Sequence, residues 1–123
     1  MSDDVISDVS GMVLVARLRA QSGRRDALLE AIRAVVQAGV ELEPGCLGVT
    51  VHISPDEPDI VFLHEHYASR EAFARHRELQ QTNERYIELG GHLRSLLAEP
   101  ITDFKVYTPV FRTIRGLTPV AAG

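Results

Sequence analysis

Alternating apolar and polar positions predict four strands in the central part of the chain. The expected strands are residues 12–19, 46–54, 60–67 and 102–108. In the first strand the alternation puts Ala16 and Leu18 on one face and Val15 and Arg17 on the other. In the second strand it puts Leu47, Val49, Val51 and Ile53 on one face and Cys46, Gly48, Thr50 and His52 on the other.

Helical spacing of apolar residues predicts an amphipathic helix between the first two strands. Its apolar stripe consists of Leu28, Ile32, Val35, Val36 and Val40. We expect Ser22 to cap this helix, and Pro44-Gly45 to follow its end. Ser69 is expected to cap a second helix, which the polar residues 80–82 break into two pieces, and Pro100 ends the second piece.

The order β-α-β-β-α-β is that of an α+β, ferredoxin-like sandwich. We expect one domain over residues 12–108, a flexible N-terminal tail over 1–11 and a C-terminal tail over 109–123. Helices would cover one sheet face, and the strand 60–67 is apolar on both of its faces. No chain remains to cover the second face, so we expect a homodimer in which two sheets pack together.

Composition narrows the class of protein. The 123 residues are 45% apolar and 24% charged, as in ordinary globular domains. A single cysteine excludes an internal disulfide and a cysteine-rich zinc site. The net charge of −4 does not indicate the basic surface that binds nucleic acid. No apolar run approaches the ~18 residues of a membrane span. The acidic first residues lack the features of a signal peptide, so we expect a cytoplasmic protein without a membrane partner.

Two segments carry a family resemblance. Glu43-Pro44-Gly45-Cys46-Leu47-Gly48 opens the second strand, and Glu65-His66-Tyr67-Ala68-Ser69-Arg70-Glu71-Ala72-Phe73 is followed by His76 on the next helix. In this order and spacing they resemble the antibiotic biosynthesis monooxygenase (ABM) family, over about residues 12–108. The resemblance implies a small dimeric α/β barrel. It also implies a cofactor-independent oxygenase that holds no metal and oxidises a quinol-like or polyketide-derived aromatic substrate with molecular oxygen.

The chemistry needs little from the protein. A deprotonated electron-rich phenol or anthrone can itself pass an electron to O2, so the protein must hold the substrate, remove a proton and exclude water. His76 matches the family's helix histidine and is the expected general base; otherwise it is a buried histidine bonded to a backbone carbonyl. Tyr67 stands where many relatives have Trp, as a pocket wall with a hydroxyl that orients substrate or as a core aromatic.

Further candidates surround this pair. Phe73 shares a helix face with His76, and Glu65 would be half buried, so it needs a hydrogen-bond or ion-pair partner. Asn83 and Tyr86 would line the pocket mouth, unless Asn83 is a helix cap and Tyr86 a core residue.

His64 and His66 point to the opposite sheet face, with His52 on a neighbouring strand. We expect a polar barrel interior there rather than a zinc site, and these histidines become the substrate-binding candidates if the substrate lies inside the barrel. Cys46 is expected to be a buried, inert thiol. Arg75 and Arg85 are expected to be solvated, although an arginine could bind an anionic quinolate.

Three other functions compete with oxygenation. The haem-degrading branch of the fold uses Asn, Trp and His where this chain has Ala16, Tyr67 and Tyr86, which argues against haem. An isomerase or other proton-transfer enzyme acting on a small sugar-like or lactone substrate would use the same histidine base. A dimeric, non-catalytic ligand-binding module would need no base. An apolar, aromatic-sized pocket favours oxygenation, a small polar one with arginines favours proton transfer, and a solid core favours the non-catalytic module.

Overall fold

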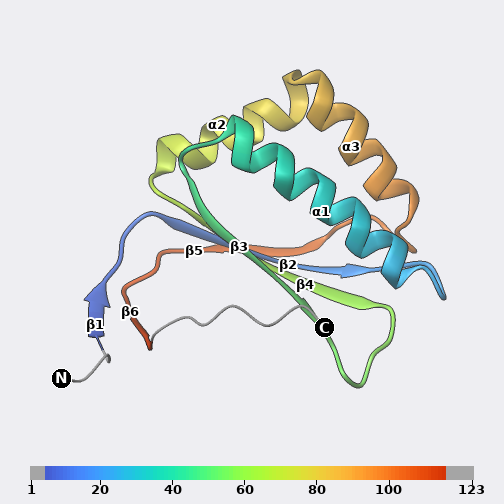
Figure 1. The fold of residues 1–123 in the computed structure, drawn as a ribbon, viewed down its shortest axis with the longest axis horizontal. Coiled ribbons are helices and arrows are strands. Elements are labelled where there is room, and N and C mark those ends of the chain that lie inside the picture. The colour runs from blue at the N-terminus through green and yellow to red at the C-terminus, as the bar shows by residue number, and fades with distance from the viewer. Residues whose placement is uncertain (1–4, 116–123) are drawn as a thin grey trace.

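The computed structural model describes residues 5–115. Their elements are, in order, β1 (Val5–Asp8), β2 (Met12–Arg19), α1 (Arg25–Leu42), β3 (Cys46–Ile53), β4 (Ile60–Tyr67), α2 (Arg70–Thr82), α3 (Glu84–Ser95), β5 (Asp103–Tyr107) and β6 (Phe111–Ile114). The main sheet is antiparallel with strand order β3-β4-β2-β5. All three helices lie on one face of this sheet (Figure 1). The predicted ferredoxin-like α+β fold is therefore confirmed.

The register of the central strands decides which side chains face the helices. Leu14 pairs with Glu65, Ala16 with Leu63 and Leu18 with Val61. These residues face the helices, whereas the alternate positions face away from them. Among residues 5–115, no helix lies on the other face of the sheet (Figure 1).

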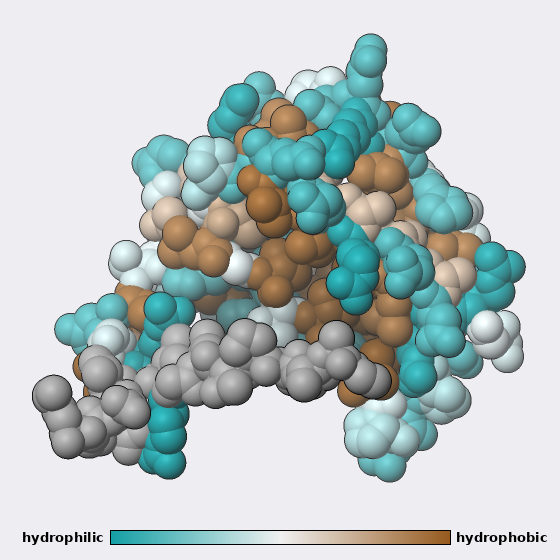
Figure 2. Space-filling view, viewed as in Figure 1, coloured by the Kyte–Doolittle hydropathy of each residue, from teal (hydrophilic) through white to brown (hydrophobic). Residues whose placement is uncertain are grey.

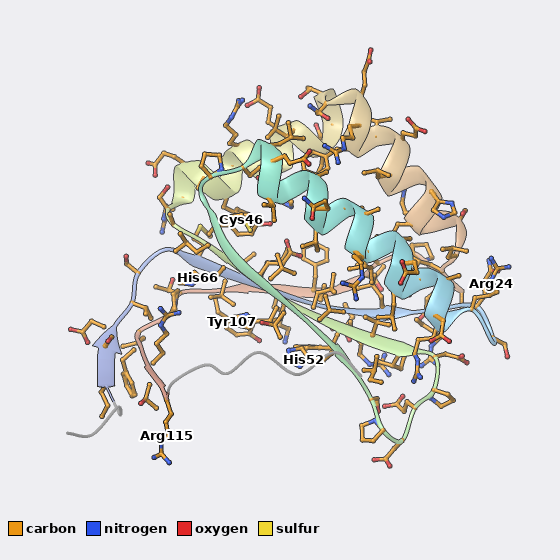
Figure 3. The ribbon with its side chains drawn as sticks, viewed as in Figure 1. Arg24, Cys46, His52, His66, Tyr107 and Arg115 are labelled. Carbon is orange, nitrogen blue, oxygen red and sulfur yellow. The ribbon has the colours of Figure 1, made fainter. Side chains whose placement is uncertain are left out.

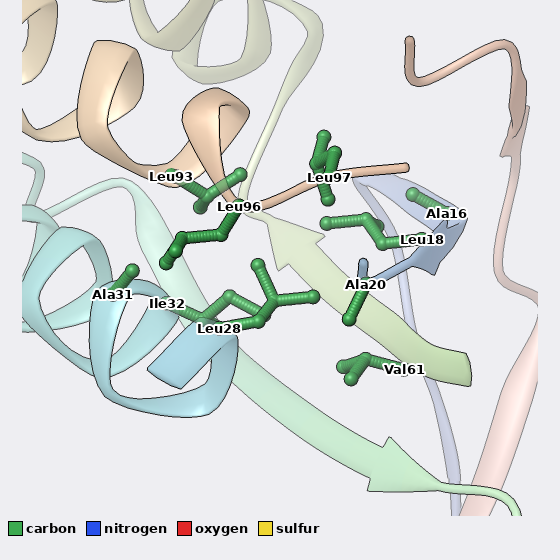
Figure 4. Close-up of a cluster of buried hydrophobic side chains, with 10 residues drawn as sticks. All are labelled: Ala16, Leu18, Ala20, Leu28, Ala31, Ile32, Val61, Leu93, Leu96 and Leu97. Carbon is green, nitrogen blue, oxygen red and sulfur yellow. The ribbon is translucent and has the colours of Figure 1, made fainter. Parts of the chain in front are cut away.

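The hydrophobic core lies between the helices and the sheet (Figure 4). Leu28 of α1 and Val61 of β4 are completely buried there. The full cluster is Ala16, Leu18, Ala20, Leu28, Ala31, Ile32, Val61, Leu93, Leu96 and Leu97. β2 contributes Ala16 and Leu18 to this cluster, and the helices α1 and α3 contribute Leu28 and Leu93.

A β-bulge at the start of β3 changes the face of one predicted residue. Cys46 pairs with Tyr67, but Gly48, two residues later, pairs with the next residue along β4, His66. Leu47 is therefore an extra residue in the ladder. The sequence alternation grouped Cys46 with Gly48, Thr50 and His52; this grouping is wrong, because the bulge turns Cys46 to the helix side.

Two of the predicted helix signals hold and one does not. Ser69 caps α2 by accepting a hydrogen bond from the Ala72 amide at 3.0 Å, as predicted. The second helix is broken, as predicted, but the break lies at Asn83, because residues 80–82 still belong to α2. Ser22 does not cap α1: a turn in which Gly23 adopts a φ of +76° delays the helix until Arg25. Arg24, and not Ser22, therefore occupies the N-cap position, and its side chain makes no capping hydrogen bond.

The two flanks predicted as tails contain strands that pair with each other. β1 and β6 form a separate antiparallel two-stranded sheet beyond the end of the main sheet (Figure 1). The prediction of tails without structure is thus wrong for residues 5–8 and 111–114, while residues 1–4 and 116–123 lie outside the described part of the chain. The paired residues of β1 and β6 are about a hundred positions apart in the sequence. Local sequence patterns therefore could not indicate this pairing.

Gly11 makes the connection from β1 to β2. Its φ is +100°, and a Cβ at this position would lie 2.0 Å from the Tyr67 carbonyl oxygen. No other residue type fits this close approach.

Candidate functional site

A pocket of about 680 Å³ lies between the helices and the sheet, next to the core. Apolar side chains supply most of its wall, and Figure 2 shows them gathered between the helices and the sheet. They are Leu14, Ala16, Leu18, Ile32, Val35, Val36, Val40, Leu47, Val49, Leu63, Phe73, Leu93, Ile101 and Phe104. The volume falls within the range of small-molecule sites. The core is therefore not solid, and the pocket is large enough for a polycyclic aromatic molecule.

Five polar side chains from β4, α2, α3 and the residue after α1 meet in this pocket. Glu43 follows α1, Glu65 and Tyr67 lie on β4, His76 on α2 and Tyr86 on α3. Glu43 and His76 are the buried charged or polar residues of the described chain, at 6% and 7% exposure. Buried polar groups at this depth require partners, and here they partner one another.

Glu43 is the centre of the first half of this cluster. Its carboxyl oxygens accept hydrogen bonds from Nδ1 of His76, at 2.9 and 3.2 Å, and from the hydroxyl of Tyr86. Because the carboxyl group is an acceptor, the Nδ1 nitrogen carries the imidazole proton. The other ring nitrogen, Nε2, is then the basic atom of a neutral His76.

Glu65 is the centre of the second half. The Tyr67 hydroxyl donates to its Oε1 at 2.5 Å, and the same oxygen lies 3.9 Å from Nε2 of His76. That second distance is too long for a direct hydrogen bond. The Tyr67 ring contacts His76, with centroids 4.8 Å apart, and meets Phe73 edge-on at 5.5 Å. The Tyr67 ring thus packs against the imidazole, and Phe73 packs against the Tyr67 ring.

The two tyrosines act as hydrogen-bond donors. Burial, together with the neighbouring carboxyl groups of Glu65 and Glu43, raises the pKa of Tyr67 far above its ordinary value. Burial and the hydrogen bond to Glu43 raise the pKa of Tyr86 in the same way. Both phenols therefore keep their protons at neutral pH, and neither is a candidate base.

The structure brings together most of the predicted site residues. Glu65, Tyr67, Phe73, His76 and Tyr86 all line the pocket. Glu65 has the partner it was expected to need, the Tyr67 hydroxyl. His76 is bonded to a carboxyl group and not to a backbone carbonyl.

Asn83 is not part of the pocket wall. Its side chain accepts a hydrogen bond from the Tyr86 amide at 3.2 Å and caps α3. The prediction that it lines the pocket mouth is therefore wrong, and the alternative of a helix cap is confirmed.

His64 and His66 lie on the other face of the sheet, as the alternation predicted. They line a second pocket, of about 480 Å³, and Nε2 of His66 lies 2.8 Å from the Ser10 carbonyl oxygen. His52 and Tyr107 also belong to this open side (Figure 3). His64 and His66 are thus separated from His76 by the sheet.

The predicted site did not include several polar residues of the pocket wall, among them Glu43 and Cys46. Glu43 was noted only in the family motif, although it lies seven residues after Val36 and continues the apolar stripe of α1. A charged residue on such a stripe indicates a buried polar site. Cys46 also lines the pocket, and burial raises the pKa of its thiol. Its position depends on the bulge at Leu47, which the sequence does not show.

Among residues 5–115, no group of three or more His, Cys, Asp or Glu side chains is arranged to hold a metal ion. Over the same residues, none of the helices has the length and apolar character required to span a bilayer.

Solved structures with this fold include several of similar size. A proposed antibiotic biosynthesis monooxygenase from Chloroflexus aurantiacus is 25% identical, with a TM-score of 0.67 over 85% of this chain and 98% of that one. The Mycobacterium tuberculosis protein Rv0793 is 26% identical, with a TM-score of 0.64 over 80% of this chain and 93% of that one. A further proposed antibiotic biosynthesis monooxygenase, from Nitrosomonas europaea, is 24% identical, with a TM-score of 0.65 over 78% and 95%. No curated protein matches the chain significantly.

The family profile for antibiotic biosynthesis monooxygenases matches residues 11–84. This range holds most of the main sheet and four of the five polar side chains of the pocket, Tyr86 lying just beyond it. It covers more than half of the sequence. The chain belongs to the antibiotic biosynthesis monooxygenase family.

Proposed function

We propose that the protein is a monooxygenase that oxidises an electron-rich phenol or anthrone with O2, and that His76 is its general base. The observation that carries this proposal is the Glu43–His76 pair. Nδ1 of His76 donates its proton to Oε2 of Glu43, with 2.9 Å between the two atoms. The basic Nε2 atom therefore remains available to a substrate hydroxyl in the pocket. Membership of the family supports the reaction class.

The shape and polarity of the pocket support an aromatic substrate. Its volume of about 680 Å³ and its predominantly apolar wall suit fused rings better than a small, strongly hydrated sugar or lactone. The polar groups converge on His76, so a hydroxyl placed there would lie near both Nε2 and the Glu65 carboxyl group. Apolar walls also exclude water from the deprotonated substrate.

The reaction balances without a cofactor for an anthrone-type substrate. His76 takes the proton of the enol form, and the substrate anion passes an electron to O2. The two radicals combine at the ring carbon, and the proton held by His76 returns to the resulting peroxide. Loss of water then leaves a carbonyl. One oxygen atom thus enters the product and the other leaves as water, while the reacting carbon loses both of its hydrogens.

The surrounding residues stabilise the charge that His76 acquires. An imidazolium between Glu43 and Glu65 is favoured by both carboxyl groups, and this lowers the free energy of the ion pair formed on proton transfer. The hydroxyls of Tyr86 and Tyr67 keep these carboxyl groups in place. Tyr67 additionally forms the wall on which the substrate ring would pack, so we assign it a substrate-positioning role.

We also propose that the working unit is a homodimer that uses the open face of the sheet. Phe62 and Tyr107 are large apolar residues of this face and are 38% and 51% exposed. A second sheet packed on it would bury both and close the barrel.

Oxygen uptake with a panel of anthrones and naphthoquinols tests the proposed reaction. The wild-type protein should accelerate uptake over the spontaneous rate, and His76→Ala should lose about a hundredfold to ten-thousandfold in kcat/KM. His92→Ala is the matched control, because His92 is an exposed residue of α3 outside the pocket. No stimulation by the wild type, with His76→Ala indistinguishable from it, would exclude this function. Turnover of a substrate without O2 would point to proton transfer alone.

A further inference from the structure

Two arginines lie at the wall of the pocket and are not bound by a carboxylate of residues 5–115. Arg77 of α2 and Arg94 of α3 both line the pocket, together with the amides of Gln80 and Gln81. Within residues 5–115 neither arginine forms an ion pair. By contrast, ion pairs join Arg17 to Glu57, Arg19 to Glu99, Arg33 to Glu30 and Arg85 to Glu41.

Both guanidinium groups are held near the pocket by contacts other than ion pairs. The Cζ atom of Arg77 lies 6.0 Å from the centre of the Phe73 ring, which is itself part of the wall. Arg94 folds back along α3, so that its Nη1 atom lies 3.2 Å from the point where Gly90 would carry a Cβ. The missing side chain at Gly90 leaves room for the guanidinium at the pocket wall.

Arg94 lies further along α3 than Tyr86, away from the carboxyl groups of Glu43 and Glu65. Gly90, against which the guanidinium lies, is one turn beyond Tyr86, or about 6 Å along the axis of α3. Glu43, which accepts the Tyr86 hydroxyl, has its oxygens committed as acceptors and offers no donor to an anion. The pocket therefore has an acceptor-rich region around His76 and a donor-rich region around Arg94.

We propose that Arg94 binds a carboxylate carried by the aromatic substrate, away from the hydroxyl that His76 deprotonates. This inference rests on the proposed function, since it names the substrate class of the same pocket: hydroxylated aromatic acids. A guanidinium without a protein partner matches a carboxylate with two parallel hydrogen bonds. The two regions of the pocket also orient the substrate, because a reversed molecule would place its carboxylate beside Glu43 and Glu65.

Anaerobic binding separates this proposal from the oxidation chemistry. The probes are 2-naphthol and 6-hydroxy-2-naphthoic acid, which differ by the carboxylate, and their own fluorescence reports binding. We expect the wild type to bind the acid about tenfold more tightly than the naphthol, because a hydrogen bond to a charged group contributes about this much. Arg94→Gln should abolish the preference without weakening the naphthol, whereas Arg77→Gln should change it little, because Arg77 lies beside Phe73.

Arg70→Gln is the matched control, an exposed arginine of α2 outside the pocket wall, and it should keep the full preference. Circular dichroism checks that each variant is folded. Equal ratios in wild type and Arg94→Gln would overturn the proposal, and so would failure of the wild type to bind either probe. A preference that depends on Arg94 in a protein without O2 uptake would uphold the carboxylate site and refute the oxygenase. Anthrone oxidation by a protein that binds the acid no more tightly than the naphthol would uphold the oxygenase and refute the carboxylate site.

Discussion

Nδ1 of His76 lies 2.9 Å from Oε2 of Glu43, and both side chains are almost completely buried. The pair joins the end of α1 to the middle of α2, and the Tyr86 hydroxyl adds α3 to the same carboxyl group. One carboxyl group thus connects the three helices above the sheet. The same contact that fixes the imidazole for chemistry also contributes to the packing of the helical layer.

Replacement of Glu43 should affect activity through His76. Glu43→Gln keeps the size and one acceptor oxygen but removes the charge that favours the imidazolium, so kcat should fall by roughly tenfold to a hundredfold with little change in naphthol binding. Glu43→Ala leaves the buried imidazole without its partner and should lower the free energy of unfolding by about 3 kcal/mol. Steady-state kinetics and urea unfolding measure the two effects.

Glu41→Gln is the control for both measurements. Glu41 lies on the same helix, two positions before Glu43, but it is exposed and pairs with Arg85, which lowers its pKa. Its replacement should leave kcat and stability nearly unchanged, because water screens this pair. An equal loss in the two glutamine variants would contradict a specific role of Glu43.

Stability should fall at alkaline pH because of Tyr67 and Tyr86. The fold raises the pKa of both phenols above the value of about 10 in an unfolded chain. A group whose pKa is raised on folding contributes fully below the unfolded pKa, and its contribution is lost as the pH rises above that value. Urea unfolding midpoints should therefore decline from about pH 10 upward.

The variants Tyr67→Phe and Tyr86→Phe identify the source of this decline. Each removes one titrating group, so each should show a shallower loss of stability above about pH 10 than the wild type, whatever its stability at neutral pH. If the stability of both variants declines with pH in parallel with the wild type, groups other than these tyrosines cause the loss of stability at alkaline pH.

Cys46 should report on occupation of the pocket. It is the only cysteine, it lines the pocket, and burial raises the pKa of its thiol. A disulfide reagent should therefore label it more slowly than a free thiol at the same pH. An aromatic ligand at about ten times its Kd should slow labelling by about tenfold if the complex does not react. A labelling rate that is independent of a bound ligand would place that ligand elsewhere.

The open face of the sheet should carry the dimer contact. Phe62→Glu places a charge on this face and should convert a dimer into a monomer, as measured by light scattering at several concentrations. Ile87→Glu is the matched control, because Ile87 is an exposed apolar residue of α3, 47% exposed, on the helical side. A wild-type mass equal to that of one chain would refute the proposed dimer directly.

Local patterns were sufficient for most of the secondary structure. The bounds of the strands Met12–Arg19 and Ile60–Tyr67 follow from apolar alternation, and the Ser69 cap follows from the chemistry of its hydroxyl. These features depend on residues that are neighbours in sequence, so a short window of sequence contains the whole interaction.

Other features depend on residues that meet only in the folded chain. The bulge at Leu47 exists because β3 pairs with β4, and it alone turns Cys46 toward the pocket. β1 acquires its structure from β6 at the far end of the chain.

The sequence by itself determined the ferredoxin-like order of elements, the family motif and His76 as the histidine of interest. Only the tertiary structure decided that Glu43 is the partner of His76, that Asn83 is a cap, and that a pocket lies under the helices beside His76. Spacing along a helix or strand specifies the face on which a residue lies. Which partner lies opposite that face depends on contacts between elements distant in sequence, and these form only when the layers pack.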